Sequence, residues 1–412
     1  MVEDRILIYA PVPLYRHEGR TFVEDQAIIG LTRWTENFGL IDAMMPVTEG
    51  APPVGWSPVE ALAPLEGRAE LHQLPMAYRP DRFARHLPAT RRRIRALIEA
   101  NDYLAFSIGG LFGDWGAVAA LTAHGMGRRF GVWTDRVESE VVRLGMHDGP
   151  WRARLRKRLY HRPMAALERA VIRRATLGLF HGRETYEAYA PFCRESHVVH
   201  DIMVSKDDHI PAARRAAKRR DAGQGPLRIA YVGRADEMKG ALDWVGVLIR
   251  LAEAGVDFTA TWLGDGGQRA EMLRRIEAAG LAGRVTAPGF VNDRAQVLEV
   301  LRAAQIFLFC HRTPESPRCL IEALFSATPI VGYDGAYARD LVAAHGGGRF
   351  VPLGDVEGLA RAVTALDADR PALQGLIDAA WADGAPFDDV SVFRHRAELI
   401  RRYLGRDRPA QA

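Results

Sequence analysis

Short apolar runs that predict β-strands alternate along the chain with longer amphipathic segments that predict helices. In the first half, the predicted strands cover residues 5–10, 40–45, 103–107, 130–133, 177–180 and 197–200. The predicted helices between them cover residues 22–38, 79–100, 116–124, 152–175 and 183–189. This alternation is typical of βαβ units built around a parallel sheet.

A second series of the same kind follows after residue 226. Its predicted strands cover residues 227–232, 258–263, 285–287, 306–309, 330–332 and 348–351. Its predicted helices cover residues 240–254, 266–279, 294–303, 320–326, 336–344 and 356–366. The segment 211–224 between the two series is charged and alanine-rich and runs into Gly225 and Pro226, so we interpret it as a linker or surface excursion.

The pattern predicts an α/β protein with two Rossmann-like domains that face each other across a cleft. With 412 residues, the chain is longer than one hydrophobic core usually serves. We place the first of these domains at 1–205 and the second at 206–387. A closing helix at 388–412 would pack back on the first domain. Ligands of such folds bind at the carboxyl ends of the strands.

Composition narrows the class of protein. Hydrophobic residues make up 48% and charged residues 26% of the chain, as in globular proteins. We find no signal-peptide pattern and no apolar run of ~18 residues that would span a bilayer. The three cysteines, Cys193, Cys310 and Cys319, have no CxxC spacing, so we expect no disulfide or structural zinc site. The expected compartment is the reducing cytoplasm.

The net charge of +4 is unevenly distributed, because arginines cluster at 91–95 and at 152–174. A solvated helix face explains any single arginine of these clusters. In the second cluster, however, Trp151, Leu155 and Leu159 are interleaved with the cations. This mixture predicts peripheral contact of the first domain with an anionic membrane on its inner face. No nucleic-acid recognition module is visible, so we do not expect nucleic acid as a partner.

Four loops after strands of the second series carry the candidate chemistry. In the first, Gly233 ends a strand, and Arg234 and Lys239 bracket the start of the next helix. An arginine fork, a lysine point charge and free helix-end amides suit a diphosphate. A surface turn with two solvated side chains is the alternative, and it explains this loop equally well when the loop is taken alone.

The second and third loops are short and glycine-rich. Gly264 and Asp265 follow one strand, and Gly289 and Val291 follow the next. Glycines here allow a backbone to approach a ligand closely, and the third loop has room to flank a flat base with backbone groups. Taken alone, both loops are also common turns of α/β proteins.

The fourth loop carries two glutamates and the start of a helix. Glu315 lies in the loop and Glu322 lies in the helix after it. A carboxylate in such a loop accepts hydrogen bonds from sugar hydroxyls, and one on the helix binds ribose hydroxyls. The alternative is a pair of helix-capping carboxylates. The segment between them opens the helix and directs amides toward an anion. Its residues are Ser316, Pro317, Arg318, Cys319 and Leu320.

In their order along the chain and in their residue motifs, these four loops resemble the donor domain of glycosyltransferase family 4, the retaining enzymes of GT-B architecture. The resemblance covers about residues 227–366 and implies that the domain at 206–387 binds the donor and the domain at 1–205 binds the acceptor. It implies that Arg234 and Lys239 bind the diphosphate and that Glu322 binds the ribose. The family usually separates its two glutamates by seven residues, whereas six lie between Glu315 and Glu322 here. Glu315 must therefore reach the sugar through a shorter loop.

The resemblance implies transfer of a sugar from a UDP- or GDP-type donor to a glycan or lipid-linked acceptor, in cell-surface or exopolysaccharide synthesis. Fixed cations and amides stabilise the departing diphosphate, so we expect no metal and no further cofactor. None of the four loops carries an Asp-x-Asp pair that would hold Mg²⁺. We assign catalytic roles to Arg234, Lys239, Glu315 and Asp135.

The first half resembles the family less closely. Gly19 is the one glycine in the opening loop, where relatives often have a Gly-Gly turn. After the strand at 130–133, relatives often have a histidine, whereas this chain has Thr134, Asp135 and Arg136. Asp135 either replaces that histidine or caps a turn. His181 ends another predicted strand on the same side, although a lone histidine is more often structural.

Three other functions compete with transfer. Gly110, Gly113 and Gly116 resemble a dinucleotide-binding turn of an oxidoreductase, but the GxGxxG spacing is absent, and we place Gly110 on the acceptor side instead. A nucleotide-sugar 2-epimerase has the same architecture but needs acid and base groups around the sugar. A protein that binds the nucleotide sugar without turnover also stays open.

Overall fold

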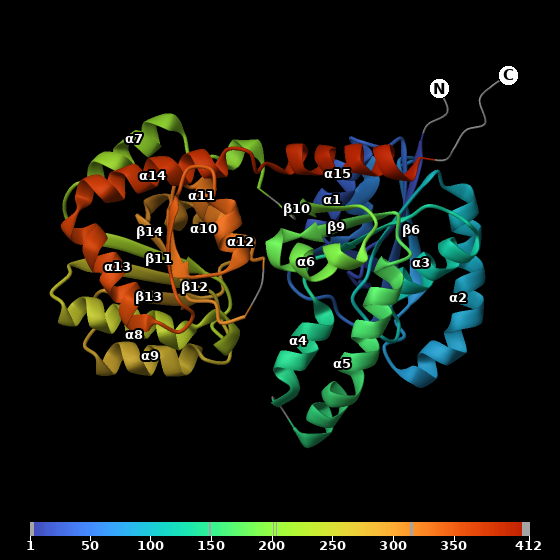
Figure 1. Ribbon diagram of the computed structural model, residues 1–412, viewed down its shortest axis with the longest axis horizontal. Coiled ribbons are helices and arrows are strands. Elements are labelled where there is room, and N and C mark those ends of the chain that lie inside the picture. Colours follow the sequence, from blue (N-terminus) through green and yellow to red (C-terminus); the bar gives the residue numbers. More distant parts are fainter. Residues whose placement is uncertain (1–3, 148–149, 201, 203, 314–315, 406–412) are drawn as a thin grey trace. The chain divides into compact units, whose positions relative to one another are not determined.

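The computed structural model describes residues 4–147, 150–200, 202, 204–313 and 316–405. The chain divides into two compact units, shown in Figure 1. Unit 1 comprises Met1–Met203 with Asp389–Ala412, and unit 2 comprises Val204–Asp388. The sequence predicted these divisions after residues 205 and 387.

Unit 1 is built on a mostly parallel sheet with the strand order β10-β9-β8-β7-β1-β4-β2-β3-β5, and β6 pairs with β4. β3 pairs antiparallel with β2 and with β5. The strands are β1 (Arg5–Tyr9), β2 (Leu14–His17), β3 (Arg20–Glu24), β4 (Leu40–Glu49), β5 (Trp56–Pro58), β6 (Ala69–Pro75), β7 (Tyr103–Ser107), β8 (Gly131–Thr134), β9 (Leu177–His181) and β10 (Ser196–Val199). The helices are α1 (Asp25–Thr35), α2 (Pro80–Ala100), α3 (Trp115–Gly125), α4 (Glu138–Leu144), α5 (Trp151–Ile172), α6 (Gly182–Tyr189) and α15 (Asp389–Leu404), with shorter 3₁₀ turns η1 (Val59–Leu65), η2 (Gly145–His147) and η3 (Ala190–Phe192).

Both faces of the sheet are buried at β1, which explains why this strand is apolar at every position from 6 to 9. Leu7 and Tyr9 point into one core, which they share with α2 and α3. Ile6 and Ile8 point into the opposite core, which they share with α1 and α15. Successive side chains of a strand alternate between faces, so a strand covered on both sides needs an unbroken apolar run.

The C-terminal helix α15 is part of unit 1. Phe393, Ala397 and Ile400 of this helix lie in the same core as Ile6 and Ile8. The helix start is held by an ion pair between Arg33 Nε and Asp389 Oδ2 at 2.7 Å. A segment from the far end of the chain therefore completes the core of the first unit.

Unit 2 is a parallel sheet with the order β13-β12-β11-β14-β15-β16. Its strands are β11 (Leu227–Val232), β12 (Phe258–Leu263), β13 (Val285–Gly289), β14 (Ile306–Phe309), β15 (Ile330–Tyr333) and β16 (Gly348–Val351). Its helices are α7 (Ala212–Asp221), α8 (Ala241–Glu253), α9 (Arg269–Ala278), α10 (Arg294–Ala303), α11 (Cys319–Phe325), α12 (Ala336–Leu341), α13 (Val356–Ala368) and α14 (Arg370–Gly384), with 3₁₀ turns η4 (Lys206–Asp208) and η5 (Glu237–Lys239).

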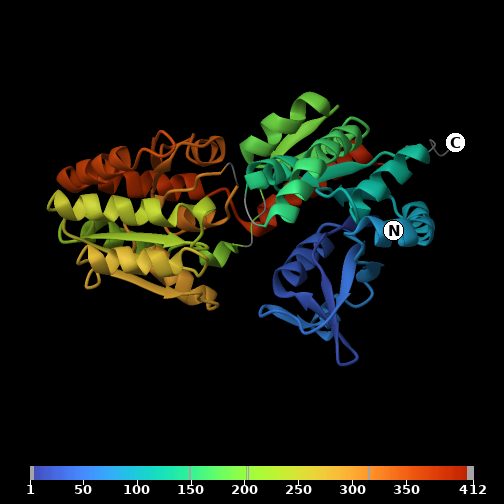
Figure 2. The ribbon, with the colours of Figure 1, turned by 90° about the horizontal axis from the view of Figure 1, so that it is seen from below.

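The helices of unit 2 form two layers. In one layer, α8 packs on α9 and α13. In the other layer, α11 packs on α10 and α14, and α14 also contacts α7. Figure 2 shows strands of unit 2 between helices. The chain moves outward from β11 to β12 and β13, then returns to the other side of β11 to form β14. This reversal creates a topological switch point between β11 and β14, where doubly wound folds bind ligands.

The structure corrects the expectation of a helix over residues 22–38. Residues Arg20–Glu24 form β3, and α1 begins only at Asp25. Phe22 and Val23 belong to a hairpin, because Tyr15 of β2 pairs with Phe22. The helical spacing of apolar residues masked the two-residue alternation at the start of this segment.

The segment 211–224 is also not a linker, because Ala212–Asp221 form helix α7 of unit 2. Lys218 in this helix is 4% exposed and donates to the Ser326 carbonyl at 2.8 Å and to Thr328 Oγ1 at 2.6 Å. Burial, and then the charges of Arg228 and Arg214, hold the pKa of Lys218 well below its usual value. The Nζ atom of Lys218 lies at the C-terminus of α11, where its N–H groups reach carbonyl groups that the helix leaves free. The charged composition of this segment had indicated that its side chains are exposed to solvent. Tertiary contacts bury Lys218 instead.

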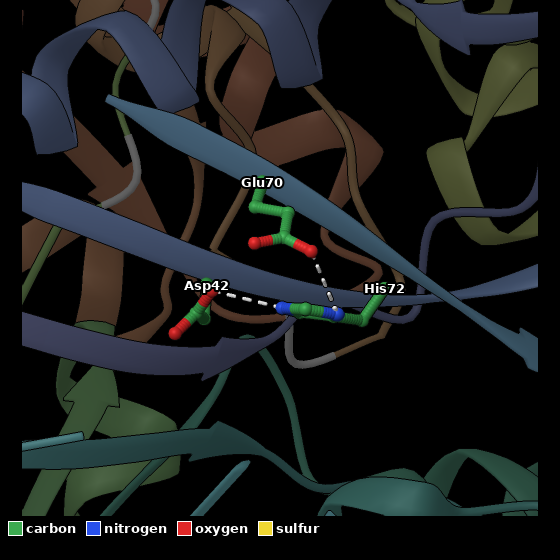
Figure 3. Close-up of side chains that lie close together, drawn as sticks. All are labelled: Asp42, Glu70 and His72. Atoms are coloured by element: carbon green, nitrogen blue, oxygen red, sulfur yellow. Dashed lines mark hydrogen bonds and ion pairs between the residues drawn. The ribbon is translucent and has the colours of Figure 1, made fainter. Parts of the chain in front are cut away.

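Asp42 holds several elements of unit 1 together in a buried network, shown in part in Figure 3. Its carboxylate accepts hydrogen bonds from Arg5 at 2.9 Å, Asn101 at 2.7 Å and His72 at 2.8 Å. Burial alone would raise the pKa of Asp42, but the hydrogen bonds from His72 and Asn101 and the charge of Arg5 hold it below its usual value. The network joins β1, β4, β6 and the end of α2.

Among the described residues, Asp42, Glu70 and His72 are the group close enough to share a metal ion (Figure 3). The second nitrogen of His72 lies 3.7 Å from Glu70. Arg5 already supplies a positive charge to Asp42. The group also lies toward the amino ends of the parallel strands β4 and β6, away from the carboxyl edge where folds of this kind bind ligands. The chemistry of the group fits an internal ion network better than a metal site.

We predict that Asp42→Ala lowers the free energy of unfolding of unit 1 by roughly 1–3 kcal/mol, because the buried side chains of His72 and Asn101 lose their hydrogen-bond acceptor. The folded-state pKa is depressed, so the contribution of Asp42 is present above the unfolded carboxyl pKa of about 4 and is lost as the pH falls below it. Urea unfolding at neutral and acidic pH measures both effects. The exposed control Glu66→Ala should behave as wild type, and an equal loss in both variants would contradict the prediction.

Candidate functional site

Three glycine-containing loops pack against one another at the carboxyl edge of the sheet in unit 2. The Gly233 amide donates to the Leu263 carbonyl at 2.9 Å, and the Gly264 amide donates to the Gly289 carbonyl at 2.8 Å. A Cβ atom at Gly264 would lie 2.0 Å from the Gly233 carbonyl oxygen. The loops that follow β11, β12 and β13 are therefore joined by backbone hydrogen bonds. A side chain at position 264 would prevent this close approach.

The loop after β11 also contacts the loop after β14, across the switch point. Gly240 has a φ of 68°, and a Cβ atom there would lie 1.9 Å from the Cys310 carbonyl oxygen. The Arg312 amide donates to the Met238 carbonyl at 2.9 Å. These contacts fix the segment that carries Lys239 beside the end of β14.

The two cations predicted to bind a diphosphate lie on this fixed segment. Asp236 orders the turn between them, because its side chain accepts from the Lys239 amide at 3.2 Å and lies 3.5 Å from the Arg234 guanidinium. The Arg234 side chain is 70% exposed and thus accessible to a ligand. Lys239 lies close enough to His311 that its charge, after burial, helps to lower the pKa of that imidazole far below its usual value.

The buried imidazole of His311 is held by the core of the sheet. Its Nε2 lies 2.5 Å from the Tyr231 hydroxyl, and the Tyr231 ring packs at a tilt against Trp262 with ring centroids 4.0 Å apart. The lowered pKa keeps His311 neutral at physiological pH. A neutral group beside Lys239 does not add a second charge at this position, so Lys239 and Arg234 stay the cations of the loop.

The structure describes the fourth loop in part. Glu315 lies outside the described residues, so its predicted role stays a prediction. Ser316, Pro317, Arg318 and Cys319 are half-buried at the start of α11. Leu320 is buried, and its amide donates to the Pro317 carbonyl at 3.2 Å. That amide is consequently used within the turn, which corrects the expectation that it points at an anion.

Glu322 lies in an ion triad within unit 2. Its Oε1 accepts from Arg294 at 3.1 Å, and Arg294 also donates to Asp208 at 3.0 Å. The Glu322 side chain is 17% exposed. Arg294 therefore fixes one carboxylate oxygen of Glu322, and the role of Glu322 in ribose binding stays a prediction.

The remaining predicted donor residues lie on the same edge. Asp265 is exposed, and its Oδ1 accepts from the Gly266 amide at 2.8 Å. Val291 is half-buried and follows β13. Arg269, which the sequence did not single out, donates to the Ala287 carbonyl at 2.8 Å and lies near Gly289. In the sequence, Arg269 is most simply explained as a solvent-facing residue at the start of a helix. No signal in the sequence marks it as part of the site.

A buried carboxylate at the switch point was also missed. Asp243 accepts two hydrogen bonds from Arg312, at 2.8 and 2.6 Å, and one from the Tyr333 hydroxyl at 2.9 Å. Asp243 is in the first turn of α8, Arg312 follows β14 and Tyr333 ends β15. The network therefore ties three elements of the ligand edge together.

The carboxyl edge of the sheet in unit 1 brings together residues from β8, β9 and β10. Thr134 is buried and pairs in register with Phe180, so Asp135 and His181 occupy the next positions of adjacent strands. Asp135 and Arg136 are exposed, and Arg136 forms an ion pair of 2.6 Å with Glu138.

The buried His181 has a second histidine beside it on this edge. The ring centroids of His181 and His200 are 6.2 Å apart. Burial, followed by the charges of His181 and Arg396, lowers the pKa of His200 to about 3, so this imidazole is neutral at physiological pH. His200 was the last residue of a predicted strand, and that position was the signal that could have identified it.

Two glycines of unit 1 have structural explanations. Gly19 lies with Glu18 at the tip of the β2–β3 hairpin, and both have positive φ, at 75° and 50°. This two-residue turn needs glycine for its backbone. The amides of Gly109 and Gly110 both donate to Asp114 at 3.0 Å, and the same carboxylate caps α3. Gly110 therefore belongs to a tightly closed loop after β7.

Comparison with known proteins identifies the architecture. HepE from Anabaena, solved in complex with UDP, superimposes with a TM-score of 0.64 over 96% of this chain and 98% of its own, at 15% identity. The chain has the GT-B fold. Residues 226–369 match the family described as glycosyl transferases group 1. The predicted α/β architecture and the resemblance to a GT-B glycosyltransferase are thereby confirmed, and membership of family 4 stays a prediction.

Sequence relatives of this GT-B chain cover part of it. It is 33% identical over 224 residues to a 2-deoxystreptamine N-acetyl-D-glucosaminyltransferase of Streptomyces fradiae, covering 52% of each chain. It is 29% identical over 196 residues to the amylovoran biosynthesis glycosyltransferase AmsK of Erwinia amylovora, covering 45% of this chain and 47% of AmsK. The chain thus matches about half the length of these relatives.

We predict that Gly240→Ala disrupts the carboxyl edge of the sheet in unit 2 far more than Gly225→Ala does. Both glycines have left-handed backbones, with φ of 68° and 73°, but only Gly240 has a neighbour within 4 Å of the added Cβ. The shared strain is about 1–2 kcal/mol, so any further loss in thermal unfolding reports the clash with Cys310. Equal losses in the two variants would show that the loops separate easily.

Proposed function

We propose that this chain is a retaining glycosyltransferase that moves a sugar from a nucleotide diphosphate sugar to a glycan or lipid-linked acceptor. One observation carries the proposal: the Arg234–Lys239 segment is locked by backbone contacts at the switch point between β11 and β14. The match of residues 226–369 to group 1 glycosyl transferases supports it.

The proposed chemistry depends on the charge that develops on the leaving group. As the bond between the anomeric carbon and the diphosphate breaks, negative charge grows on the departing oxygen. Arg234 offers planar paired donors and Lys239 a point charge, and both stabilise that oxygen most strongly in the transition state. Because the loop is already ordered by Asp236 and Cys310, little reorganisation is needed during the reaction.

In the proposed complex, Glu322 binds the ribose through the oxygen that Arg294 does not hold. In the same proposal, Glu315 contacts the sugar and Asp135 keeps the catalytic role predicted from the sequence. The diphosphate itself assists removal of the acceptor proton in a retaining reaction of this type, so a strong protein base is not needed. The donor is a UDP or GDP sugar, and UDP is the nucleotide in the HepE structure.

We further propose that the acceptor belongs to a cell-surface or exopolysaccharide pathway and that the protein works in the cytoplasm, at the inner face of the membrane. The similarity to AmsK, a protein of amylovoran biosynthesis, favours this acceptor class. Across the described part of the chain, every helix is too short or too polar to cross a bilayer. Contact with the membrane would then be peripheral.

Two other functions use the same nucleotide site. A binding protein without turnover would retain UDP or GDP binding but give no transfer and no sugar hydrolysis. A 2-epimerase would convert the free donor in the absence of any acceptor. Product analysis of a donor-sugar mixture with and without added glycan acceptor separates these functions from transfer.

We expect Arg234→Ala or Lys239→Ala to reduce transfer by roughly ten- to hundred-fold, because each removes a hydrogen bond to a charged group worth about 1.5–3 kcal/mol. Initial rates with a UDP or GDP sugar measure the loss. Arg274→Ala is a matched control, since that side chain is 75% exposed in the same unit. Unchanged rates in both loop variants would place the diphosphate elsewhere.

Transfer should persist after treatment with EDTA, because the proposed charge stabilisation comes from side chains rather than a bound metal. Rates measured before and after chelation, and after Mg²⁺ or Mn²⁺ is returned, test this point. A rate that disappears with EDTA and returns with metal would contradict the metal-independent mechanism.

A further inference from the structure

Helices α4 and α5 form a hairpin that extends away from the rest of unit 1 (Figure 1). Its base is fixed by Glu168, which accepts from the Ser139 amide at 3.0 Å and from the Ser139 hydroxyl at 2.5 Å. Nearer the tip, Lys157 donates to the Gly145 carbonyl at 2.7 Å. The hairpin is thus held in place by contacts within unit 1, and its outer surface is a fixed feature of the fold.

Large apolar side chains are exposed along the outer face of α5. Trp151, Leu155 and Leu159 are 62%, 49% and 61% exposed. They are four residues apart, so they form one stripe along the helix. Leu144, at the end of α4, adds another side chain that is 42% exposed. The opposite face of α5 packs into the core through Met164, Val171 and Ile172. These core contacts hold the helix on unit 1, so the fold does not depend on the exposed stripe.

Cations border this apolar stripe on both sides. The exposed arginines of the same helix are Arg152, Arg154, Arg156, Arg158 and Arg162. The helix contains no acidic residue before Glu168. Arg152 lies over the Trp151 ring, with its guanidinium carbon 5.4 Å from the ring centroid. An apolar stripe bordered by long cationic side chains is the arrangement that lies in the interface of a bilayer, with its rings and leucines in the acyl region and its cations among phosphates.

We infer that the outer face of α5, from Trp151 to Arg162, is a docking surface for a bilayer with anionic head groups. A second copy of this chain would bring two equally basic faces together, and like charges repel. Nucleic acid would use the arginines but leave the apolar stripe in water. The inference deepens the membrane contact proposed above and rests on that proposal for its role, but its test requires no transfer activity.

The test is flotation of the full-length protein with vesicles of phosphatidylcholine, alone or mixed equally with phosphatidylglycerol. Wild type should float with the anionic vesicles only. Neutralising Arg154, Arg156 and Arg158 to Gln should weaken partitioning roughly five-fold per arginine. Leu155→Ser with Leu159→Ser should weaken it by roughly ten-fold or more.

Matched controls separate this surface from general effects. Leu159→Ser alone is compared with Leu353→Ser, since both side chains are 61% exposed and Leu353 lies in unit 2. Only Leu159→Ser should reduce flotation. A thermal-shift measurement with UDP and GDP should be the same for wild type and all variants, so loss of nucleotide binding and loss of membrane binding are read separately.

Several results would overturn the inference. One is wild type that stays with the unbound fraction in the presence of anionic vesicles. Another is flotation that the leucine and arginine variants do not reduce. A dimer in ultracentrifugation that Leu155→Ser with Leu159→Ser abolishes would assign the stripe to a second copy. Binding to a DNA oligonucleotide without binding to vesicles would assign the arginines to nucleic acid.

Discussion

The ligand edge of unit 2 depends on backbone contacts between loops that no side chain would permit. Gly264 lies against the carbonyl of Gly233, and Gly240 lies against the carbonyl of Cys310. These contacts bring the ends of β11, β12 and β14 together and leave Lys239 at the switch point. A cation on a loop this constrained is placed before any ligand arrives, which is the condition under which electrostatic stabilisation is most effective.

Buried ionisable groups are hydrogen-bonded in a different way in each unit. In unit 1, Asp42 is surrounded by Arg5, Asn101 and His72, so its charge is balanced by hydrogen bonds from three elements. In unit 2, Lys218 has carbonyl and hydroxyl acceptors at a helix C-terminus instead. In both arrangements the buried polar group is hydrogen-bonded, as burial requires, and neither group lies at the carboxyl edge of its sheet.

Unit 1 separates its chemistry from its outer surface. Asp135, His181 and His200 gather at the carboxyl edge of the sheet, where polar groups of adjacent strands meet. The exposed stripe of α5 lies on a hairpin that Glu168 and Lys157 hold in place. Changes to the stripe therefore leave the strand ends intact, and the two regions can be tested independently.

The sequence by itself determined the alternating elements, the two Rossmann-like halves and the four loops after strands of the second series, because strand and helix periodicities and turn residues are local properties. The GT-B assignment came from the resemblance of those loops to a known family. The strands at 227–232 and 258–263 were predicted to the residue. Only tertiary structure decided that 211–224 is a helix with a buried lysine, that Gly19 serves a hairpin and that Glu322 is held by Arg294. Those outcomes depend on partners distant in sequence, and local pattern carries no information about which partner a charge or a turn will meet.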